Sequence, residues 1–421
     1  MRYKTHTLGC KVNFYETEAM EEILNRAGHE KTDGVADLYL INTCTVTALA
    51  EQKSRQFLRR AKRENADAMV VAVGCYAQVN PDEIAALGVD LVVGTQDRMR
   101  IAELIEDALH GGTKNVVRSL EPDMDFEALT ISDTDARTRA FMKIEDGCDR
   151  YCAYCKIPYA RGPVRSRSLV SIREEAERLV REGFREIVLT GIHVASFGRG
   201  TDKDLADAVA IVAEAGAERV RLSSMDPMWI TRERLARLAD IPAFCDHFHL
   251  SLQSGSTEIL RAMGRPYTRE DFLDRTRMIR EFFPEVGLST DIIAGFPGET
   301  EEDLEDSHTI IGEARFHRVH VFPYSRREGT RAAKMTEHLT TAEKKHRAAM
   351  LSQEAQRVRI AEEEKRIGTV VRVLTERADE DGAEGFSTQY ERVFVPHARE
   401  NALIRVQIVK RDGERLIGKE I

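Results

Sequence analysis

Short apolar runs alternate with longer amphipathic stretches along the first hundred residues. Patterns typical of buried strands occur at residues 3–8, 38–42, 69–73 and 91–93, and helical patterns occur at 17–27, 50–63, 81–87 and 98–109. Asn80 and Pro81 provide a helix start, because asparagine caps helices well and proline fits the first turn. This alternation predicts a doubly wound α/β domain with a largely parallel sheet.

A second alternating series follows a polar connection, residues 113–138, which we interpret as a linker. Strands are expected at 141–144, 186–190, 219–222, 248–252, 287–293 and 318–321, with helical segments between them. Six such units predict a central partial (β/α)6 TIM-like barrel. In a barrel of this kind the carboxyl ends of the strands carry the chemistry.

The pattern changes twice more toward the C-terminus. Residues 331–365 are strongly charged and favour a helical connection, whereas short β-rich runs over 366–421 predict a small β-barrel. Small barrels often bind RNA on an open face; the alternative is a rigid accessory domain. The expected organisation is therefore an N-terminal domain over 1–112, a linker over 113–138, the central barrel over 139–330, the helical connection and the terminal barrel.

Composition narrows the class of protein. Charged residues make up 32% and hydrophobic residues 42% of the 421 residues, and no apolar run approaches the roughly 20 residues that a membrane span needs. The N-terminus lacks the apolar core of a signal peptide, so the seven cysteines indicate reduced thiols and metal binding in the cytoplasm. Without an obvious self-pairing surface, we expect a monomer.

Charge gives a mixed signal about nucleic acids. The net charge of −9 argues mildly against binding them. One predicted helix nevertheless gathers Lys53, Arg55, Arg59, Arg60, Lys62 and Arg63. Such a cluster is either a phosphate-facing patch or a solvated face.

The most informative motif is Cys148, Cys152 and Cys155, at the spacing C-x-x-x-C-x-x-C. A closed structural zinc site takes four protein ligands, and this motif offers three. A four-iron cluster on three thiolates would leave one iron open to chelate a small molecule. The alternatives are a zinc knuckle with a distant fourth ligand, or three unrelated thiols.

A second set of cysteines follows three predicted strands. Cys10, Cys44 and Cys75 each come just after the carboxyl end of a strand, one βα unit apart. In an open α/β sheet this edge binds ligands, so the three side chains are expected to meet there. They predict a second cluster with an open iron, although a single buried cysteine is more often inert. We interpret the remaining Cys245 as a core residue.

Small polar residues occur at the strand ends of the predicted barrel. Ser251, Gln253 and Asp291 are candidates for contacts with a nucleoside or an amino acid, with turn or capping roles as the alternative. Gly191 could let backbone approach a ligand. The histidines are interpreted as packing or surface residues: His193, His247, His249 and His320.

The paired cysteine sets and the terminal β-module resemble the radical S-adenosylmethionine methylthiotransferases over essentially the whole chain. The resemblance implies two [4Fe-4S] clusters and S-adenosylmethionine as cofactors, with no catalytic residue assigned beyond the cluster ligands. It implies that one cluster on Cys148, Cys152 and Cys155 binds S-adenosylmethionine and that the auxiliary cluster on Cys10, Cys44 and Cys75 carries the sulfur. We place Tyr154, an aromatic residue of the kind the family prefers there, in the same pocket as Ser251, Gln253 and Asp291. The terminal module corresponds to TRAM, which is taken to bind RNA.

Local motifs favour one branch of that family. The sequences around the first three cysteines, such as Thr7-Leu8-Gly9-Cys10-Lys11-Val12-Asn13, resemble the branch that methylthiolates N6-threonylcarbamoyladenosine at position 37, beside the anticodon of tRNA. The isopentenyladenosine and ribosomal-protein branches are the alternatives. The implied partners are the tRNA anticodon loop and an electron donor protein. Rivals are a radical methylase that delivers no sulfur and a zinc-bearing RNA-binding protein.

Overall fold

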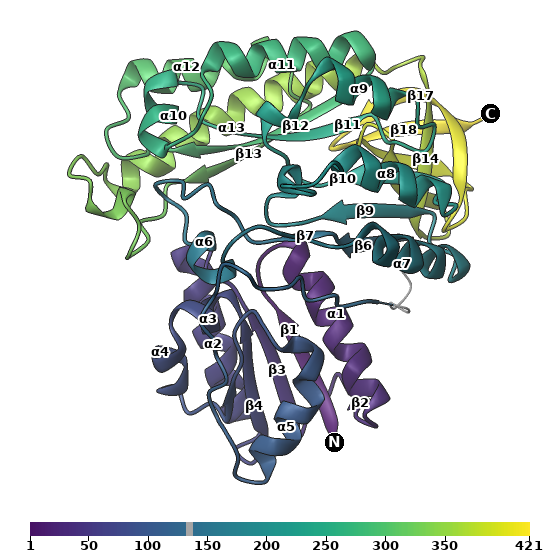
Figure 1. The fold of residues 1–421 in the computed structure, drawn as a ribbon. Helices are drawn as coiled ribbons and strands as arrows, with labels where there is room; N and C mark the ends of the chain where they lie inside the picture. The colour runs from purple at the N-terminus through teal and green to yellow at the C-terminus, as the bar shows by residue number, and fades with distance from the viewer. Residues whose placement is uncertain (132–137) are drawn as a thin grey trace.

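The computed structural model describes residues 1–131 and 138–421 and arranges them as an N-terminal α/β unit, a central barrel and a C-terminal β-barrel (Figure 1). The N-terminal sheet is entirely parallel and has the order β2-β1-β3-β4-β5. Its strands are β1 (Arg2–Thr7), β2 (Glu30–Lys31), β3 (Leu38–Thr43), β4 (Met69–Gly74) and β5 (Leu91–Val92). This confirms the doubly wound domain expected from the sequence.

Helices cover both faces of this sheet, and a hydrophobic cluster fills each side. They are α1 (Lys11–Arg26), α2 (Ala48–Glu64), α3 (Cys75–Val79), α4 (Pro81–Ala85) and α5 (Ile101–Leu109). Helix α1 begins six residues earlier than expected, because its first turns carry the buried polar residues Asn13 and Glu16, which an apolar pattern does not mark. Asn80 precedes Pro81 at the start of α4 as expected, but its side chain makes no capping hydrogen bond.

The central unit contains the six parallel strands expected from the sequence, as two three-stranded sheets that follow one another in the order β6-β9-β10 and β11-β12-β13. They are β6 (Arg139–Lys143), β9 (Glu186–Thr190), β10 (Arg219–Leu222), β11 (His247–Gln253), β12 (Gly287–Ala294) and β13 (Arg318–Pro323). Two isolated bridges connect the sheets: Val220 of β10 pairs with Phe244, and Met225, beyond β10, pairs with Leu250 of β11. Strands β6 and β13 lie at the two ends of this order, so the barrel is partial.

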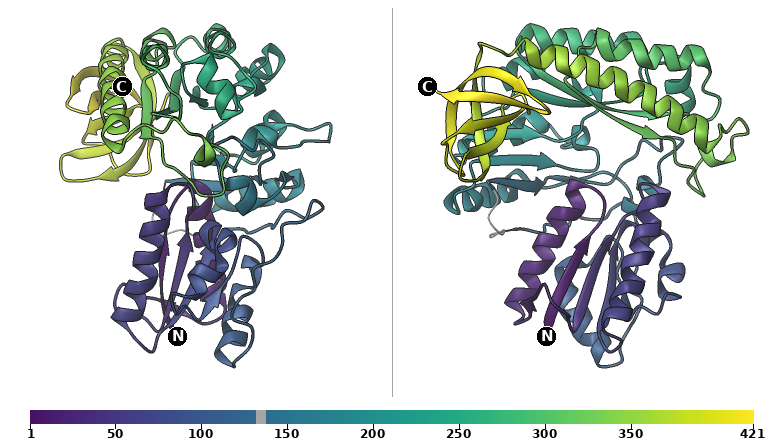
Figure 2. Two further views of the ribbon diagram at one scale, coloured as in Figure 1. Left: turned by 90° about the vertical axis from the view of Figure 1, so that its left-hand side faces the viewer. Right: turned by 180° about the vertical axis from the view of Figure 1, so that it is seen from behind.

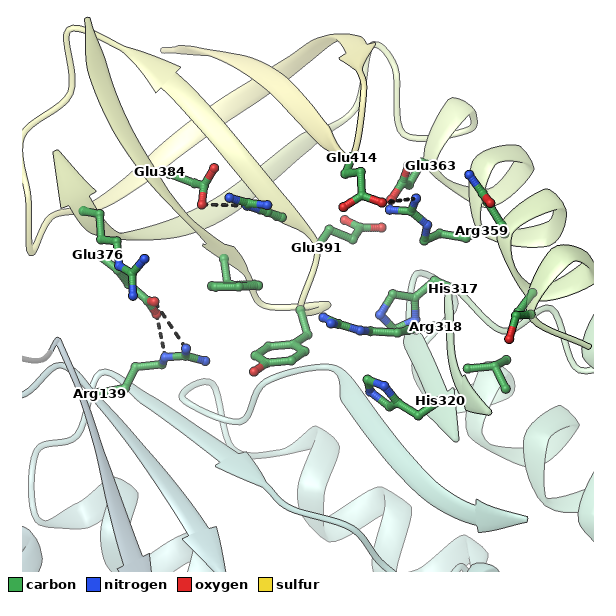
Figure 3. Close-up of a pocket in the computed structure, with 18 residues that line it drawn as sticks. Arg139, His317, Arg318, His320, Arg359, Glu363, Glu376, Glu384, Glu391 and Glu414 are labelled. Carbon is green, nitrogen blue, oxygen red and sulfur yellow. Dashed lines mark hydrogen bonds and ion pairs between the residues drawn. The ribbon is translucent and has the colours of Figure 1, made fainter. Parts of the chain in front are cut away.

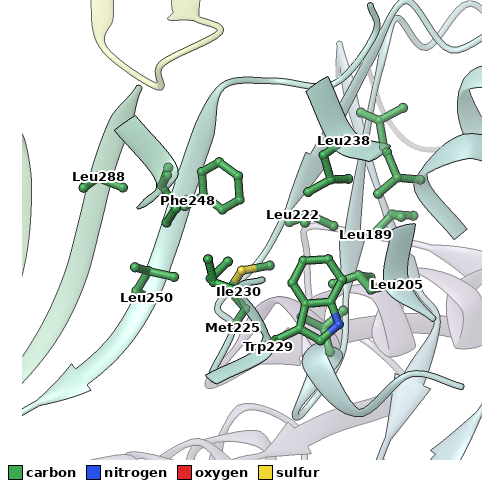
Figure 4. Close-up of a cluster of buried hydrophobic side chains, with 14 of the residues drawn as sticks. Leu189, Leu205, Leu222, Met225, Trp229, Ile230, Leu238, Phe248, Leu250 and Leu288 are labelled. Atoms are coloured by element: carbon green, nitrogen blue, oxygen red, sulfur yellow. The ribbon is translucent and has the colours of Figure 1, made fainter. Parts of the chain in front are cut away.

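Helices surround the outside of these strands: α7 (Leu169–Arg181), α8 (Leu205–Glu214), α9 (Arg232–Ala239), α10 (Thr257–Met263), α11 (Arg269–Phe282) and α12 (Glu301–Glu313). Leu189, Leu222, Phe248 and Leu250 pack with Trp229 in one continuous core (Figure 4). A short hairpin, β7 (Glu145–Asp146) and β8 (Arg165–Ser166), was not expected, because two-residue strands leave no readable pattern.

The chain returns along the barrel through α13 (Thr341–Glu364), which runs beside α12 (Figure 2). It then forms a closed barrel in the order β14-β15-β16-β18-β17. Its strands are β14 (Val370–Ala378), β15 (Gly382–Ser387), β16 (Arg392–Pro396), β17 (Leu403–Asp412) and β18 (Arg415–Glu420). Arg219 and Arg221, from the amino-terminal half of the central barrel, donate hydrogen bonds of 2.9 and 2.8 Å to Phe386 and Thr388 carbonyls of this terminal barrel.

Between α5 and β6, the described part of the predicted linker contains one isolated bridge, from Asn115 to Val92. Leu129 and Ile131 are buried in the core of the central barrel, so the end of this segment packs firmly. The remaining residues of that prediction, 132–137, lie outside the described residues. Within the described chain, every helix is too short or too polar to cross a membrane.

Candidate functional site

The first cysteine set lies at one edge of the N-terminal sheet. Cys10 precedes α1, Cys44 directly follows β3, and Cys75 opens α3 immediately after β4. The strands β1, β3 and β4 are neighbours, so their carboxyl ends bring the three thiols to a common mouth. Gly9 makes room there: a Cβ at this position would lie 2.7 Å from the Cys44 sulfur.

The thiols of this set influence one another. Burial raises the pKa of Cys44 to about 12, and the nearby Cys75 and Cys10 thiols add to the increase. All seven cysteines are free of disulfides. Three neighbouring thiolates would repel one another. The thiols therefore ionise together only beside a positive centre, such as a bound metal.

The second set lies on the loop that follows β6 and β7. The Cys148 amide donates to the Gly162 carbonyl at 2.9 Å, and the Cys155 amide donates to the Cys152 carbonyl at 3.0 Å. Burial raises the pKa of Cys155 to about 12, with further increases from Cys152 and Cys148. Gly147 is required before this loop: its φ is +87°, and a Cβ would lie 1.9 Å from the Pro163 carbonyl oxygen.

Each set offers three sulfur donors to a metal centre. Thiolates on a four-iron cluster sit farther apart than the ligands of one zinc ion, and sulfur is the donor that such clusters prefer. The donor chemistry of each set therefore fits a [4Fe-4S] cluster.

Arg161 connects the two sets. It ends α6 (Ile157–Arg161), just beyond Cys155, and its Nε donates to the Cys75 sulfur at 3.1 Å. The side chain is fully buried. A single guanidinium therefore links the segment after the barrel cysteines to the sheet edge that carries the other three.

Arg161 belongs to a buried charge cluster between the two units. Glu16 on α1 accepts from Arg161 at 2.5 Å, and it pairs with Arg98 at 2.5 Å and with Lys143 at 2.9 Å. Burial alone would raise the pKa of Glu16, but Arg161, Arg98 and Lys143 lower it to about 2. Asp146 pairs with Lys143 at 2.9 Å in the same cluster. These ion pairs fix the sheet edge against the barrel.

The candidates for the cofactor pocket lie on two neighbouring strands and the cysteine loop. The Ser251 hydroxyl on β11 lies 2.8 Å from the Ser224 hydroxyl, and Gln253, at the end of that strand, has a positive φ of 72°. Asp291 on β12 pairs with His249 at 3.2 Å. Tyr154 is half-buried and packs on a separate small cluster that includes Phe296.

The structure adds residues that the sequence did not single out. Arg265, just after α10, donates to the Cys152 sulfur at 3.3 Å. Asp226 pairs with Arg150 of the cysteine loop at 3.0 Å and lies 3.8 Å from Arg265. Burial opposes ionisation of Asp226, but His193, Arg265 and Arg150 lower its pKa to about 2. These contacts join residues far apart in the chain, so no local spacing could have revealed them.

Glu145 is a further buried carboxyl group beside the cysteine loop. It accepts from the His193 amide at 2.7 Å, and burial raises its pKa well above the usual value. Gly191 accommodates it, since a Cβ there would lie 2.6 Å from a Glu145 carboxylate oxygen. In the structure, Gly191 thus makes room for this carboxyl group.

A polar cavity of about 660 Å³ opens between β6, β13, α13 and the terminal barrel (Figure 3). Arg139, Arg318, His320 and Tyr390 line it. Several arginine and glutamate side chains lie along its wall, and some are paired, such as Arg139 with Glu376 at 2.5 Å (Figure 3). The cavity therefore favours a polar guest over an apolar one.

Lys11, the residue after Cys10, lies near this cavity. It is exposed to solvent, but the protein around it is dense enough that burial lowers its pKa. The positive charges of Arg139 and Arg221 lower this pKa further, whereas Tyr390 and Glu186 raise it. Its ammonium lies 5.8 Å from the centre of the Phe141 ring on β6.

Comparisons with known proteins agree with this arrangement. The family model described as the radical SAM superfamily matches residues 142–310, and the model described as uncharacterized protein family UPF0004 matches residues 2–94. The second cysteine set falls within the first match, and the first set falls within the second. The fold and the cysteine sets thus define a radical S-adenosylmethionine enzyme.

Relatives narrow the class. The threonylcarbamoyladenosine tRNA methylthiotransferase MtaB of Bacillus subtilis is 37% identical over 96% of this chain and 93% of its own length. The enzyme of the same name from Thermotoga maritima is 36% identical over 94% and 90%. A tRNA-2-methylthio-N(6)-dimethylallyladenosine synthase of Acetivibrio thermocellus is 33% identical over 99% and 87%. The chain belongs to the radical S-adenosylmethionine methylthiotransferase family.

Solved structures share the fold at low sequence identity. The radical S-adenosylmethionine methyltransferase TsrM of Kitasatospora setae superimposes with a TM-score of 0.57 and 18% identity, over 76% of this chain and 72% of that one. The cobalamin-dependent radical enzyme OxsB gives a TM-score of 0.53 and 12% identity, over 85% of this chain and 56% of that one. These likenesses support the arrangement of an α/β unit in front of a partial barrel.

Proposed function

We propose that this chain inserts a methylthio group at C2 of N6-threonylcarbamoyladenosine at position 37 of tRNA, giving 2-methylthio-N6-threonylcarbamoyladenosine. The observation that carries this proposal is the direct contact between the two cysteine regions through Arg161 and Cys75. A reaction that inserts sulfur needs a radical-generating centre and a sulfur-bearing centre in one protein. The two threonylcarbamoyladenosine tRNA methylthiotransferases that align with 96% and 94% of this chain support the choice of substrate.

In this proposal the six cysteines hold two [4Fe-4S] clusters: Cys148, Cys152 and Cys155 in the barrel, and Cys10, Cys44 and Cys75 on the sheet. When bound, the clusters and S-adenosylmethionine supply the radical that removes the C2 hydrogen and the sulfur and methyl group that replace it. Arg265 orients the Cys152 sulfur through its 3.3 Å hydrogen bond. Tyr154, Ser251, Gln253 and Asp291 belong to the S-adenosylmethionine pocket.

The three units divide the work. We assign the auxiliary cluster to residues 1–112, the radical chemistry to 139–330, and RNA contacts to the terminal TRAM-like barrel over 366–421, with 113–138 and 331–365 as connections. The anticodon loop presents unpaired bases, so adenosine 37 can leave its stack and enter the barrel at small cost. The protein acts as a cytoplasmic monomer and receives its electron from a separate donor protein.

Analysis of bulk tRNA tests the proposal. Nucleosides from a strain that lacks this gene should contain threonylcarbamoyladenosine but not its 2-methylthio form, and the wild-type gene should restore that form. Loss of the 2-methylthio isopentenyl nucleoside instead would identify the second candidate, which the dimethylallyladenosine synthases among the relatives support. Unchanged tRNA together with loss of a methylthio group from a ribosomal protein would assign a protein substrate.

A further inference from the structure

Lys11 occupies a position between the auxiliary cysteines and the barrel interior. It directly follows Cys10 and is the first residue of α1, and Figure 1 shows the start of this helix beneath β6. The ammonium lies 5.8 Å from the centre of the Phe141 ring on that strand. Its charge is also close enough to Tyr390 and Arg139, at the wall of the 660 Å³ cavity, to interact with them.

Among residues 1–131 and 138–421 the Lys11 ammonium forms no ion pair or hydrogen bond with a carboxylate, although Glu186 acts on its charge at longer range. Its cationic neighbours do have carboxylate partners. Arg139 pairs with Glu376 at 2.5 Å, and Arg221 shares Glu186 with Arg219, at 2.8 and 2.7 Å. These three arginines face only two carboxylates, so the positive charge around Lys11 favours an external anion.

We propose that Lys11 binds the carboxylate of the threonylcarbamoyl group and so selects this nucleoside over one with an apolar N6 substituent. The inference rests on the proposed function and names the residue that sets its specificity. The threonylcarbamoyl group ends in a carboxylate, whereas an isopentenyl group has no polar atom. A site with an ammonium that lacks an ion-pair partner and with a polar wall binds the threonylcarbamoyl group more tightly than the isopentenyl group. The reason is that burying an unpaired charge against an apolar group is costly.

The position of Lys11 adds a geometric reason. Because Cys10 is its neighbour in the chain, a carboxylate held by Lys11 would keep the modified base beside the cysteine set that carries the sulfur. The Phe141 ring holds the ammonium through a cation–π contact. Lys11 is thus a positioning as well as a specificity-determining residue.

Binding measurements on anaerobically prepared holoenzyme test the proposal. The probes are three anticodon stem-loops, which carry threonylcarbamoyladenosine, its primary amide in place of the carboxylate, or unmodified adenosine at position 37. We expect the wild type to bind the acid about tenfold more tightly than the amide, and Lys11→Gln to abolish that preference by weakening the acid alone. Lys11→Arg should keep most of the preference, and Lys114→Gln, which removes an exposed charge after α5, should change nothing.

Different failures have different meanings. An unchanged preference in Lys11→Gln, or a wild type that binds acid and amide equally, would overturn the role of Lys11. So would equal weakening of all three stem-loops, which would indicate a phosphate contact or a damaged cluster; iron content is measured alongside. The proposed function fails separately, if the wild type converts no threonylcarbamoyl stem-loop to its methylthio product.

Discussion

Arg161 Nε donates to the Cys75 sulfur at 3.1 Å while its two terminal nitrogens hold the Glu16 carboxylate at 2.5 and 2.9 Å. The guanidinium thus neutralises a buried carboxylate and orients a cysteine of the auxiliary set at the same time. Because the Arg161 side chain is buried, removing it should destabilise the folded protein: Glu16 cannot regain contact with water.

Replacing Arg161 with methionine should therefore destabilise the protein. We expect Arg161→Met to lower the free energy of unfolding by about 3 kcal/mol, the lower end of the range for breaking a buried pair, because Arg98 and Lys143 still face Glu16. Urea unfolding followed by circular dichroism measures it. The exposed pair of Arg173 with Glu214, 2.7 Å apart, is the control, and Arg173→Met should cost less than about 1 kcal/mol. Equal losses in both variants would show that the buried cluster contributes little.

The two cysteine sets should lose their clusters independently. Holoenzyme should contain about eight irons, and Cys44→Ala or Cys152→Ala should each leave about four. Cys44→Ala should retain reductive cleavage of S-adenosylmethionine to 5′-deoxyadenosine, whereas Cys152→Ala should lose it. Cys245→Ala, at a buried free cysteine outside both sets, should keep all the iron. Cleavage that survives in Cys152→Ala would contradict the assignment of the barrel set.

The sequence alone predicted the elements that carry the cysteines. The strands at 186–190 and 219–222 match the structure residue for residue. The first carries an apolar run, as buried parallel strands do, whereas the second alternates Arg219 and Arg221 with apolar residues. Placing Cys10, Cys44 and Cys75 at one edge then required only the rule that parallel strands share a carboxyl end.

The contacts around those cysteines could not be predicted in the same way. Arg161 reaches Cys75 across 86 residues of sequence, and Arg265 reaches Cys152 across 113. These sequence separations follow no helical or strand periodicity. Arginines are also common on protein surfaces, so the residues around Arg161 and Arg265 do not distinguish them from solvent-exposed arginines. Glu16 is similar: its burial became visible only when the barrel was packed against α1.

The basic residues of α2 form an exposed stripe. Lys53, Arg59 and Arg63 are exposed and have no carboxylate partner in the described chain, whereas Arg55 and Lys62 pair with Glu83 and Asp90. The helix starts at the barrel, where the Ala48 amide donates to Ser325 at 3.1 Å. The amino-terminal end of α2 therefore lies next to the central barrel, and these basic residues follow it along the helix.

Reversing these three charges should weaken tRNA binding. We expect Lys53→Glu, Arg59→Glu and Arg63→Glu together to reduce affinity at least about tenfold and to lower the salt dependence by about two to three counterions. Fluorescence anisotropy at several salt concentrations measures both. The matched control reverses three exposed arginines on the outer helices α9 to α11: Arg232, Arg261 and Arg277. If both triple variants weaken binding equally, net charge and not the α2 stripe is responsible.

Acidification should loosen the junction between the central and terminal barrels through His317. This residue is buried at the junction, where Gly287 comes close to both its ring and the Gln389 carbonyl. Burial lowers its pKa to about 3; the Leu288 carbonyl opposes this, and the positive charges of Arg366 and Arg318 add to it.

A folded-state pKa below the unfolded value of about 6.5 means that the unfolded chain takes up the proton first. The contribution of His317 is therefore complete above about pH 6.5 and is lost progressively as the pH falls toward about 3. At about pH 5 the loss should reach about 2 kcal/mol relative to neutral pH. Unfolding free energies measured from about pH 7.5 to about pH 5 should fall less steeply for His317→Asn than for the wild type. Identical slopes for the two proteins would show that His317 stays neutral for another reason or that the junction opens before global unfolding.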